Sequence, residues 1–263
     1  MKGVIHTHST YSDGDLTLPE IRDVYRAAGC AFVAMTDHAE SFHIERMREY
    51  IAECAALSTP DFLMIPGVEF TCERRMHVLG IGVTDLGVGR NPVDVFAHVA
   101  RAGGLSVIAH PHADNFAWIE SLEALPHGIE AWNSKYDGRY APRVATFDLL
   151  VRLQARRPDM RAFYSQDYHW RRQFRGLFLE VEAASLERVD ILAAFRRGAF
   201  TAIKGRDRLP SSGQLQPAMR ARFAEAHERS QRIRGLVHKA RGLARRLGMP
   251  EPAGFKAQLR RIF

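Results

Sequence analysis

The first fourteen residues read MKGVIHTHSTYSDG (1–14): a short apolar run that ends directly in His6, His8 and Asp13. An apolar run of this length is too short for a helix and is typical of a buried strand. Successive side chains of a strand alternate between its faces, so His6 and His8 are expected to point to the same side. Asp13 follows within one turn and can reach the same space. Imidazoles and carboxylates are common metal ligands, and the stretch therefore predicts a metal site at a strand end.

Other short apolar runs along the chain carry candidate ligands at the same place. His38 follows the run 31–36, Glu69 closes the run 62–70, and His110 comes directly after the run 105–109. Asp167 and His169 follow the run 161–165, and His77 lies at the start of the run 76–83. The carboxyl ends of parallel strands meet at one face, so we expect these distant side chains to converge.

The alternation of short apolar runs with helix-like segments predicts an α/β fold. Nearly continuous apolar strands are typical of a parallel sheet that is buried on both faces, and this number of strands favours a closed barrel. No GxGxxG or P-loop motif opens a helix, which disfavours a nucleotide cofactor. Strands are expected at 2–7, 31–36, 62–70, 76–83, 105–109, 128–132, 161–165 and 176–181, and helices near 18–28, 43–57, 91–102, 115–124, 141–156 and 186–197.

The chain has 263 residues, of which 46% are hydrophobic and 25% charged, and the composition is that of a globular protein. We expect a barrel over residues 1–204 and a basic helical extension over 205–263. The net charge of +7 is uneven, because the extension holds fourteen Lys and Arg against four Asp and Glu. No apolar run approaches the roughly 20 residues that span a bilayer. Three scattered cysteines indicate a reducing compartment, and we expect a cytoplasmic protein.

The extension predicts a linker at 211–213 and one long helix at about 218–248, which Met249–Pro252 would end. Contact with a nucleic-acid backbone or an anionic membrane is an alternative for this basic segment. We favour a solvated helix that docks on the barrel, because no stacking aromatics lie among its arginines. The docking stripe would be formed by Ile233, Val237, Ala240, Ala244 and Leu247.

Six motifs together resemble those of the PHP (polymerase and histidinol phosphatase) superfamily. The resemblance implies a distorted seven-stranded (βα) barrel that binds up to three divalent metal ions and hydrolyses phosphate esters. It covers residues 1 to about 204. The motifs, in order, are His6–Gly14, Thr36-Asp-His38, Gly67-Val-Glu69, His77-Val-Leu-Gly80, Ile108-Ala-His-Pro111 and Gln166-Asp-Tyr-His169.

The same resemblance implies a role for each candidate ligand. His6, His8, Glu69 and Asp167 would hold a first ion, and Glu69 would bridge to a second ion held by His77 and His110. Asp13, His38 and His169 would hold the third. Zn, Mn and Fe all suit such ligands. A hydroxide bridging two ions would attack the phosphate, so no protein nucleophile is needed and Cys72 is not a candidate. Asp37 is expected to orient a histidine without binding metal.

The substrate is expected to be a small phosphomonoester, such as a nucleotide or a phosphorylated metabolite. Lys135, Arg139 and Arg171 lie in loops at the expected mouth and are candidates for binding phosphate. One alternative is phosphodiester cleavage at nucleic-acid ends, with the basic extension delivering the strand. A second alternative is a metal-binding module without catalysis. A third, an amidohydrolase-type barrel, is disfavoured because no lysine ends a central strand.

Overall fold

The structure, a computed structural model, describes residues 1–246 and contains two six-stranded sheets. In the first sheet the strand order is β12-β11-β10-β1-β2-β4, and in the second it is β3-β5-β6-β7-β8-β9. The strands are β1 (Lys2–Thr7), β2 (Phe32–Met35), β3 (Asp37–His38), β4 (Leu63–Ile65), β5 (Val68–Thr71), β6 (His77–Ile81), β7 (Leu105–Ala109), β8 (Gly128–Asn133), β9 (Arg161–Ser165), β10 (Leu177–Val181), β11 (Phe200–Lys204) and β12 (Asp207–Pro210).

The two sheets are joined by strands that break and continue. β2 and β3 are separated only by Thr36, and β4 and β5 only by Pro66 and Gly67. β2 pairs with β4 in parallel, and β3 pairs with β5 in parallel. The ring closes where β1 meets β9, because the Tyr168 amide donates to the His6 carbonyl and the His8 amide to the Tyr168 carbonyl (3.1 and 2.8 Å). The barrel thus has seven strands, if β2–β3 and β4–β5 are each counted as one interrupted strand. The other five are β1, β6, β7, β8 and β9.

The break between β4 and β5 requires Gly67. A Cβ atom there would lie 2.7 Å from the Gly80 carbonyl oxygen and 2.8 Å from that of Met35, so no other residue fits without moving backbone. The sequence predicted one uninterrupted strand over 62–70. Proline cannot donate to the ladder and glycine permits the close approach, so the run bends here and directs β5 toward the barrel mouth.

The expected α/β class is confirmed, but the expected all-parallel sheet is not. β6 runs antiparallel to both β5 and β7, and β10 runs antiparallel to β1. A hairpin turn at Glu73–Arg75 connects β5 to β6, which leaves room for no crossover helix. β10, β11 and β12 extend the first sheet as an antiparallel ribbon, and β12 lies beyond the boundary expected at residue 204.

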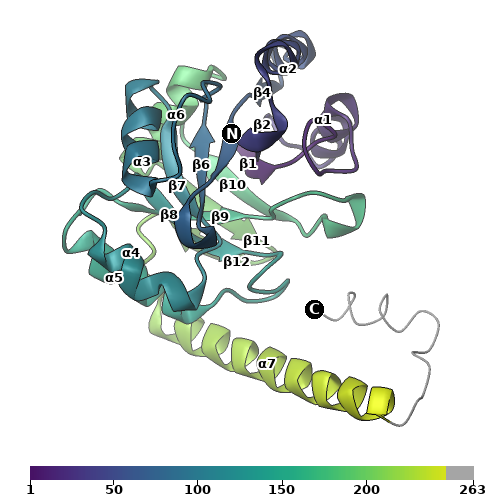
Figure 1. The fold of residues 1–263 in the computed structure, drawn as a ribbon, viewed down its shortest axis with the longest axis vertical. Helices are drawn as coiled ribbons and strands as arrows, with labels where there is room; N and C mark the ends of the chain where they lie inside the picture. The colour runs from purple at the N-terminus through teal and green to yellow at the C-terminus, as the bar shows by residue number, and fades with distance from the viewer. Residues whose placement is uncertain (247–263) are drawn as a thin grey trace.

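Helices pack around the outside of the sheets (Figure 1). The observed helices lie within a few residues of the expected positions, because their apolar faces and capping residues are visible in the sequence. They are α1 (Leu18–Ala27), α2 (Ile44–Leu57), α3 (Pro92–Arg101), α4 (Phe116–Ser121), α5 (Val144–Gln154), α6 (Arg188–Arg197) and α7 (Pro217–Arg246). None of them, within the described part of the chain, is long and apolar enough to span a bilayer.

α7 is a long rod at one end of the barrel (Figure 1). It docks through its first turns: Phe223 is 1% exposed and packs against Trp132, with ring centroids 5.9 Å apart. Met219 and Ala226 pack on the same core. The expected docking stripe is therefore wrong at Ile233, which is 39% exposed. The side chains of Val237, Ala240 and Ala244, together with Leu247 and the stop at Met249–Pro252, lie outside the described residues.

Candidate metal centre

The barrel mouth is built from the ends of strands that run in both directions. His38 is the last residue of β3 and His110 directly follows β7, while Glu69, the second residue of β5, is paired with His38. His77 is the first residue of β6, and because β6 is antiparallel its start lies at this same end. The strand pairing shows this position directly, since His77 is opposite both Thr71 and Ala109, the last residues of β5 and β7.

All nine candidate ligands come together at this mouth. They form four overlapping groups in which one donor atom from each residue lies within 4.8 Å of the others. The groups are His8, Asp13, His38 and His169; His6, His110 and Asp167; His6, His8 and Glu69; and His38, Glu69 and His77.

Glu69 is at the centre of the site. Its carboxylate is 1% exposed. Oε1 lies 3.0 Å from His77 Nδ1 and 3.2 Å from His110 Nε2. It also lies 3.4 Å from His6 Nε2, while Oε2 lies 3.3 Å from His8 Nε2. Both oxygens therefore face imidazoles on different sides, which is the geometry required of a carboxylate that bridges two cations.

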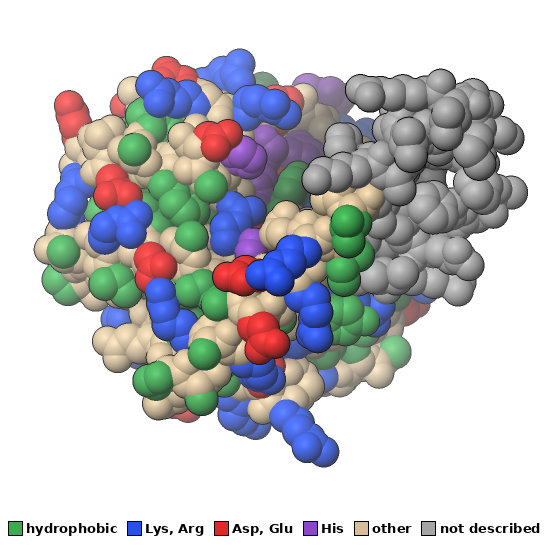
Figure 2. Space-filling model, turned by 90° about the horizontal axis from the view of Figure 1, so that it is seen from below, with side chains coloured by type: hydrophobic (Ala, Val, Ile, Leu, Met, Phe, Trp, Pro, Cys, Tyr) green, Lys and Arg blue, Asp and Glu red, His purple; other side chains and the backbone are tan. Residues whose placement is uncertain are grey.

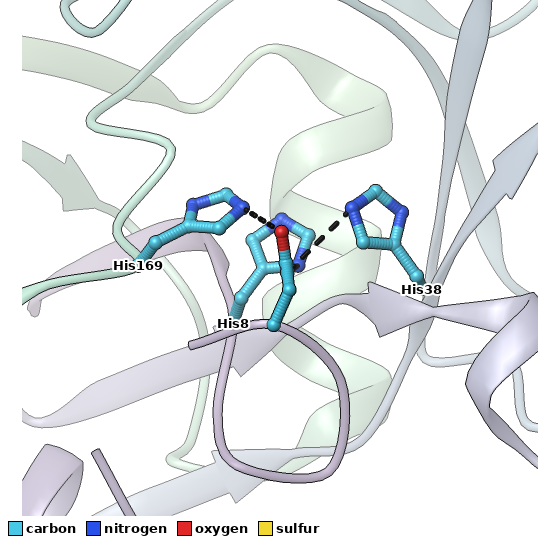
Figure 3. Close-up of side chains that lie close together, drawn as sticks. His8, His38 and His169 are labelled. Carbon is cyan, nitrogen blue, oxygen red and sulfur yellow. Dashed lines mark ion pairs between the residues drawn. The ribbon is translucent and has the colours of Figure 1, made fainter. Parts of the chain in front are cut away.

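Asp13 lies at the outer side of the site among three imidazoles. Its Oδ2 is 3.2 Å from His169 Nε2, and its Oδ1 is 3.6 Å from His8 Nδ1 and 3.7 Å from His38 Nε2. Figure 3 shows His8, His38 and His169 turned toward one another around this position.

Exposure increases from the floor of the site to its rim. His6, His8, Glu69, Asp167 and His169 are at most 2% exposed, whereas the Asp13 side chain is 54% exposed. In Figure 2 histidine side chains lie in a hollow of the surface with Lys and Arg side chains near its edge. A small solute can therefore reach the cluster through this hollow, past the exposed side chain of Asp13.

Three comparisons with known proteins bear on this arrangement. No family model matches the chain. The DNA polymerase/3'-5' exonuclease PolX of Bacillus subtilis (strain 168) is 30% identical over 93 residues, covering 32% of this chain and 15% of that protein. The chain therefore matches only a small part of that relative's length.

Two solved structures share the fold. One is a two-domain protein containing a predicted PHP-like metal-dependent phosphoesterase from Bacteroides vulgatus ATCC 8482, with 20% identity, 86% of this chain and 69% of that chain covered, and a TM-score of 0.56. The chain has a PHP-like fold. PsfC from Pseudomonas syringae PB-5123 is also similar, with 12% identity, 86% and 97% coverage, and a TM-score of 0.51. The resemblance inferred from the six sequence motifs is thus confirmed for the fold.

The electrostatics of the barrel mouth divide the donors into two sets. The carboxylates and His8 are in the forms that metals bind, whereas, against the lowering effect of burial, neighbouring carboxylates raise the pKa values of His6, His110 and His169, the last to about 9. Burial alone would raise the pKa of Glu69, but His6, His110 and His77 hold it well below its ordinary value. The pKa of Asp167 is lowered in the same way, by His6, His169 and Lys135 against the effect of burial. Burial lowers the pKa of His8 to about 4. At neutral pH the carboxylates are therefore ionised and His8 is neutral.

The donor set fits divalent cations. His8 is completely buried, and neither of its ring nitrogens has a hydrogen-bond partner, which is costly unless another group binds them. The distance from His8 Nε2 to Glu69 Oε2 is 3.3 Å, which is longer than a good hydrogen bond. Two ligands about 2.05 Å from one tetrahedral ion lie about 3.3 Å apart. The spacing is that of ligands sharing an ion.

The local backbone is unusual at three of the candidate ligands. His6, His110 and Asp167 have positive φ values of 60°, 26° and 48°, a region that non-glycine residues seldom adopt. The pairing of β1 with β2 also shifts register between Val4 and Thr7. His6 and His8 therefore face the same site by way of an irregular strand, and not by the regular alternation that the sequence predicted. Strain of this kind is concentrated at functional sites.

Sequence reasoning missed Glu130 and assigned the wrong partner to Asp37. Asp37 Oδ1 accepts from the Ser9 amide (2.7 Å) and the Ser12 hydroxyl (2.6 Å), so it braces the loop before Asp13 and not a histidine. Glu130, in β8, is the carboxylate that contacts a ligand ring: its Oε1 lies 2.7 Å from His6 Nδ1. The signal in the sequence was a glutamate inside the apolar run 128–132, where an unpaired carboxylate would be costly.

The three candidate phosphate-binding residues lie at different distances from the centre. Lys135 Nζ is 3.1 Å from Asp167 Oδ1 and 3.2 Å from His169 Nδ1, inside the cluster. Arg139 lines a cavity of about 150 Å³ between its loop and α7. Arg171 is 61% exposed and pairs with Glu20 at 3.6 Å. Tyr136, which the sequence did not single out, packs on His110 with ring centroids 4.4 Å apart.

Proposed function

We propose that this protein is a metal-dependent phosphoesterase that hydrolyses small phosphomonoesters, such as a nucleotide or a phosphorylated metabolite. The observation that carries the proposal is the convergence of six imidazoles and three carboxylates on one mouth, centred on Glu69. The PHP-like fold supports it, because the solved relative from Bacteroides vulgatus is described as containing a predicted metal-dependent phosphoesterase. Within the chain, the barrel would carry the activity and the extension with α7 would be an appendage.

The nine side chains would hold up to three divalent ions, with Zn, Mn and Fe all compatible. His6, His8, Glu69 and Asp167 would bind the first ion. Glu69, His77 and His110 would bind the second. The third would be bound by Asp13, His38 and His169. When bound, such ions would lower the pKa of water, which supplies a hydroxide nucleophile, and would polarise the phosphate oxygens, which stabilises the negative charge that develops on them.

The chain's own residues then bind and orient the substrate. Lys135 would place one positive charge against a phosphate oxygen, since its ammonium group already lies beside Asp167. Arg139 and Arg171 would contact the outer part of a substrate. The floor formed by His6 and His8 is completely buried, so the phosphate would enter from the open side of the site.

A covalent mechanism through the cysteine near the site is disfavoured. Cys72 is completely buried, and burial raises the pKa of its thiol to about 12. The thiolate is the nucleophilic form, and it is scarce at neutral pH under these conditions.

The experiment is a phosphate-release assay on protein stripped with a chelator and reloaded with Zn, Mn or Fe. We expect release from 5′-nucleotides and sugar phosphates only after reloading. A metal-loaded protein that releases no phosphate from a broad panel would favour a metal-binding module without catalysis.

A second candidate, cleavage of phosphodiesters at nucleic-acid ends, is favoured by one juxtaposition. The cavity beside Arg139 is also lined by Arg229 of α7, and Tyr140 in the same loop is 65% exposed. A basic helix beside exposed aromatics is the pattern that single-stranded nucleic acids contact. The ring of Phe223 in α7 is buried against Trp132, so the exposed aromatic beside the helix is Tyr140 of the neighbouring loop.

Parallel rates on a 5′-nucleotide and a short oligonucleotide separate the two candidates. The double substitution Arg229→Ala and Tyr140→Ala should raise KM for the oligonucleotide about tenfold and leave the nucleotide unaffected. The matched control is Arg232→Ala, whose guanidinium lies 3.4 Å from Glu228. An unchanged KM for the oligonucleotide would exclude delivery by α7.

A further inference from the structure

A pair of buried side chains in β8 lies directly beneath the candidate ligands. Glu130 and Asn133 are both completely buried, and Asn133 Nδ2 donates to Glu130 Oε2 at 2.8 Å. Residues three apart normally face opposite sides of a strand. Here the pairing of β8 with β9 shifts register between Glu130 and Trp132, and this bulge turns both side chains toward the barrel mouth.

Glu130 contacts two candidate ligands with separate oxygens. Oε1 accepts from His6 Nδ1 at 2.7 Å, and Oε2 accepts from the backbone amide of His110 at 2.7 Å. When Nδ1 carries the donated proton, His6 Nε2 has its lone pair free toward Glu69 and Asp167. The amide contact in turn fixes the backbone of His110, whose φ is positive.

Asn133 connects this pair to the rest of the site. Its Nδ2 lies 3.3 Å from Asp167 Oδ2, and its Oδ1 accepts from the Lys135 amide at 3.1 Å and the Tyr136 amide at 3.3 Å. Three candidate ligands and the loop that carries Lys135 are thus held by one hydrogen-bonded unit.

We propose that Glu130 is a positioning residue for the metal cluster, which acts with Asn133 to couple the first two ions. It orients a ligand of the first ion, His6, and a ligand of the second, His110, through one carboxylate. The third group, Asp13, His38 and His169, has no contact with Glu130 among the described hydrogen bonds. The inference rests on the metal-binding part of the proposed function.

The substitution Glu130→Gln tests the proposal with almost no change in shape. A carboxylate accepts at both ends, whereas a glutamine side chain donates at one end. Because His6, His110 and Asn133 all donate to Glu130, at least one of these bonds is lost. Loss of a carboxylate that orients a metal-binding histidine typically weakens metal affinity about 10–100-fold.

The measurement is a Zn²⁺ titration against a competing chelator, with imidazole resonances recorded by NMR to assign each ion. We expect the ions beside His6 and His110 to bind about 10–100-fold more weakly, and the ion beside His38 and His169 to keep its affinity. Glu53→Gln is the matched control, because Glu53 accepts one hydrogen bond from Tyr11 Oη and touches no candidate ligand. Equal weakening of all ions, or no weakening, would overturn the proposal.

A second measurement on the unaltered protein covers the case in which Glu130→Gln does not fold. The Zn-loaded protein should show a strongly downfield proton resonance on His6 Nδ1, from its bond to the carboxylate. Zn-loaded protein without that proton would refute the positioning role while leaving metal binding intact. Failure of the protein to bind Zn²⁺ at all would instead contradict the proposed function.

Discussion

The rings of His8 and His169 stack with their centroids 4.0 Å apart and their planes at 26°, across the seam where β1 meets β9. Asp13 lies beside both rings. The closing seam of the barrel and the candidate metal centre are therefore the same place, and a cation bound between these residues also holds the seam together.

Metal binding should consequently stabilise the fold. A ligand that binds only the folded state at about 100 times its Kd adds about 2.7 kcal/mol to the free energy of unfolding. For a chain of this size that corresponds to about 5–10 °C in Tm. Differential scanning calorimetry with and without a chelator checks this. In the double variant Asp13→Ala, His169→Ala the chelator should lower Tm by less than in the unaltered protein. An unaltered protein whose Tm does not change on addition of the chelator would contradict stabilisation by metal.

Asp167→Asn should remove activity and preserve the fold. The carboxylate lies within 3.7 Å of the ring nitrogens of both His6 and His8, so its charge is central to the cluster, while asparagine has nearly the same shape. We expect a loss of at least about 100-fold in kcat/KM. Circular dichroism verifies folding, and Asp23→Asn, on exposed α1 surface, is the control. Retention of more than half of the activity would show that Asp167 is not a ligand.

Stability should fall at acid pH through a histidine remote from the site. Burial, with Arg157 and Arg196 nearby, lowers the pKa of His127 from 6.5 to about 4. Between these values the unfolded chain binds a proton that the folded chain does not, so this contribution to stability is complete above 6.5 and is lost as the pH falls toward 4.

The variant His127→Asn isolates this effect. The Oδ1 atom of the introduced asparagine can replace His127 Nδ1 as the acceptor for the Ser106 amide. With chelator present, so that release of metal does not contribute, Tm of the unaltered protein should drop relative to the variant as the pH falls through this range. A constant difference in Tm would refute the assignment.

Much of the site could be predicted because ligand chemistry is visible in single residues. Eight of the nine candidate ligands lie at or close to the ends of apolar runs, where a charged or imidazole side chain is unexpected, and Asp13 lies in the loop that follows the first run. Glu130 obeys the same logic as Glu69, since each is a carboxylate in an otherwise apolar strand. Glu130 was missed because only a bulge in β8 turns its side chain toward the site, and no residue type in the sequence predicts that bulge.

Strand direction was harder to predict. The runs that form β6 and β7 are both short and apolar, yet β6 is antiparallel to β5 because a short connection of five residues, 72–76, joins the two strands. The docking of α7 was misjudged for a related reason. The regular stripe from Ile233 onward suggested the contact, but Ile233 is 39% exposed and the helix docks through the ring of Phe223, which packs against Trp132.

The docking of α7 can be tested by a pair of substitutions on the helix. Phe223→Ala removes a buried ring and should lower the free energy of unfolding by about 3–5 kcal/mol. Leu236→Ala, at a side chain that is 67% exposed, should change it by less than about 0.5 kcal/mol. Urea unfolding curves measure both. Equal effects of the two substitutions would mean that the helix docks elsewhere.

The most direct test of the whole account is anomalous X-ray diffraction from crystals of the protein loaded with Mn or Zn. We predict peaks at the barrel mouth, about 2.0–2.2 Å from nitrogen or oxygen atoms of the nine side chains, with two of the ions bridged by Glu69. Metal-saturated crystals in which Glu69 and Asp167 bind no ion would contradict it.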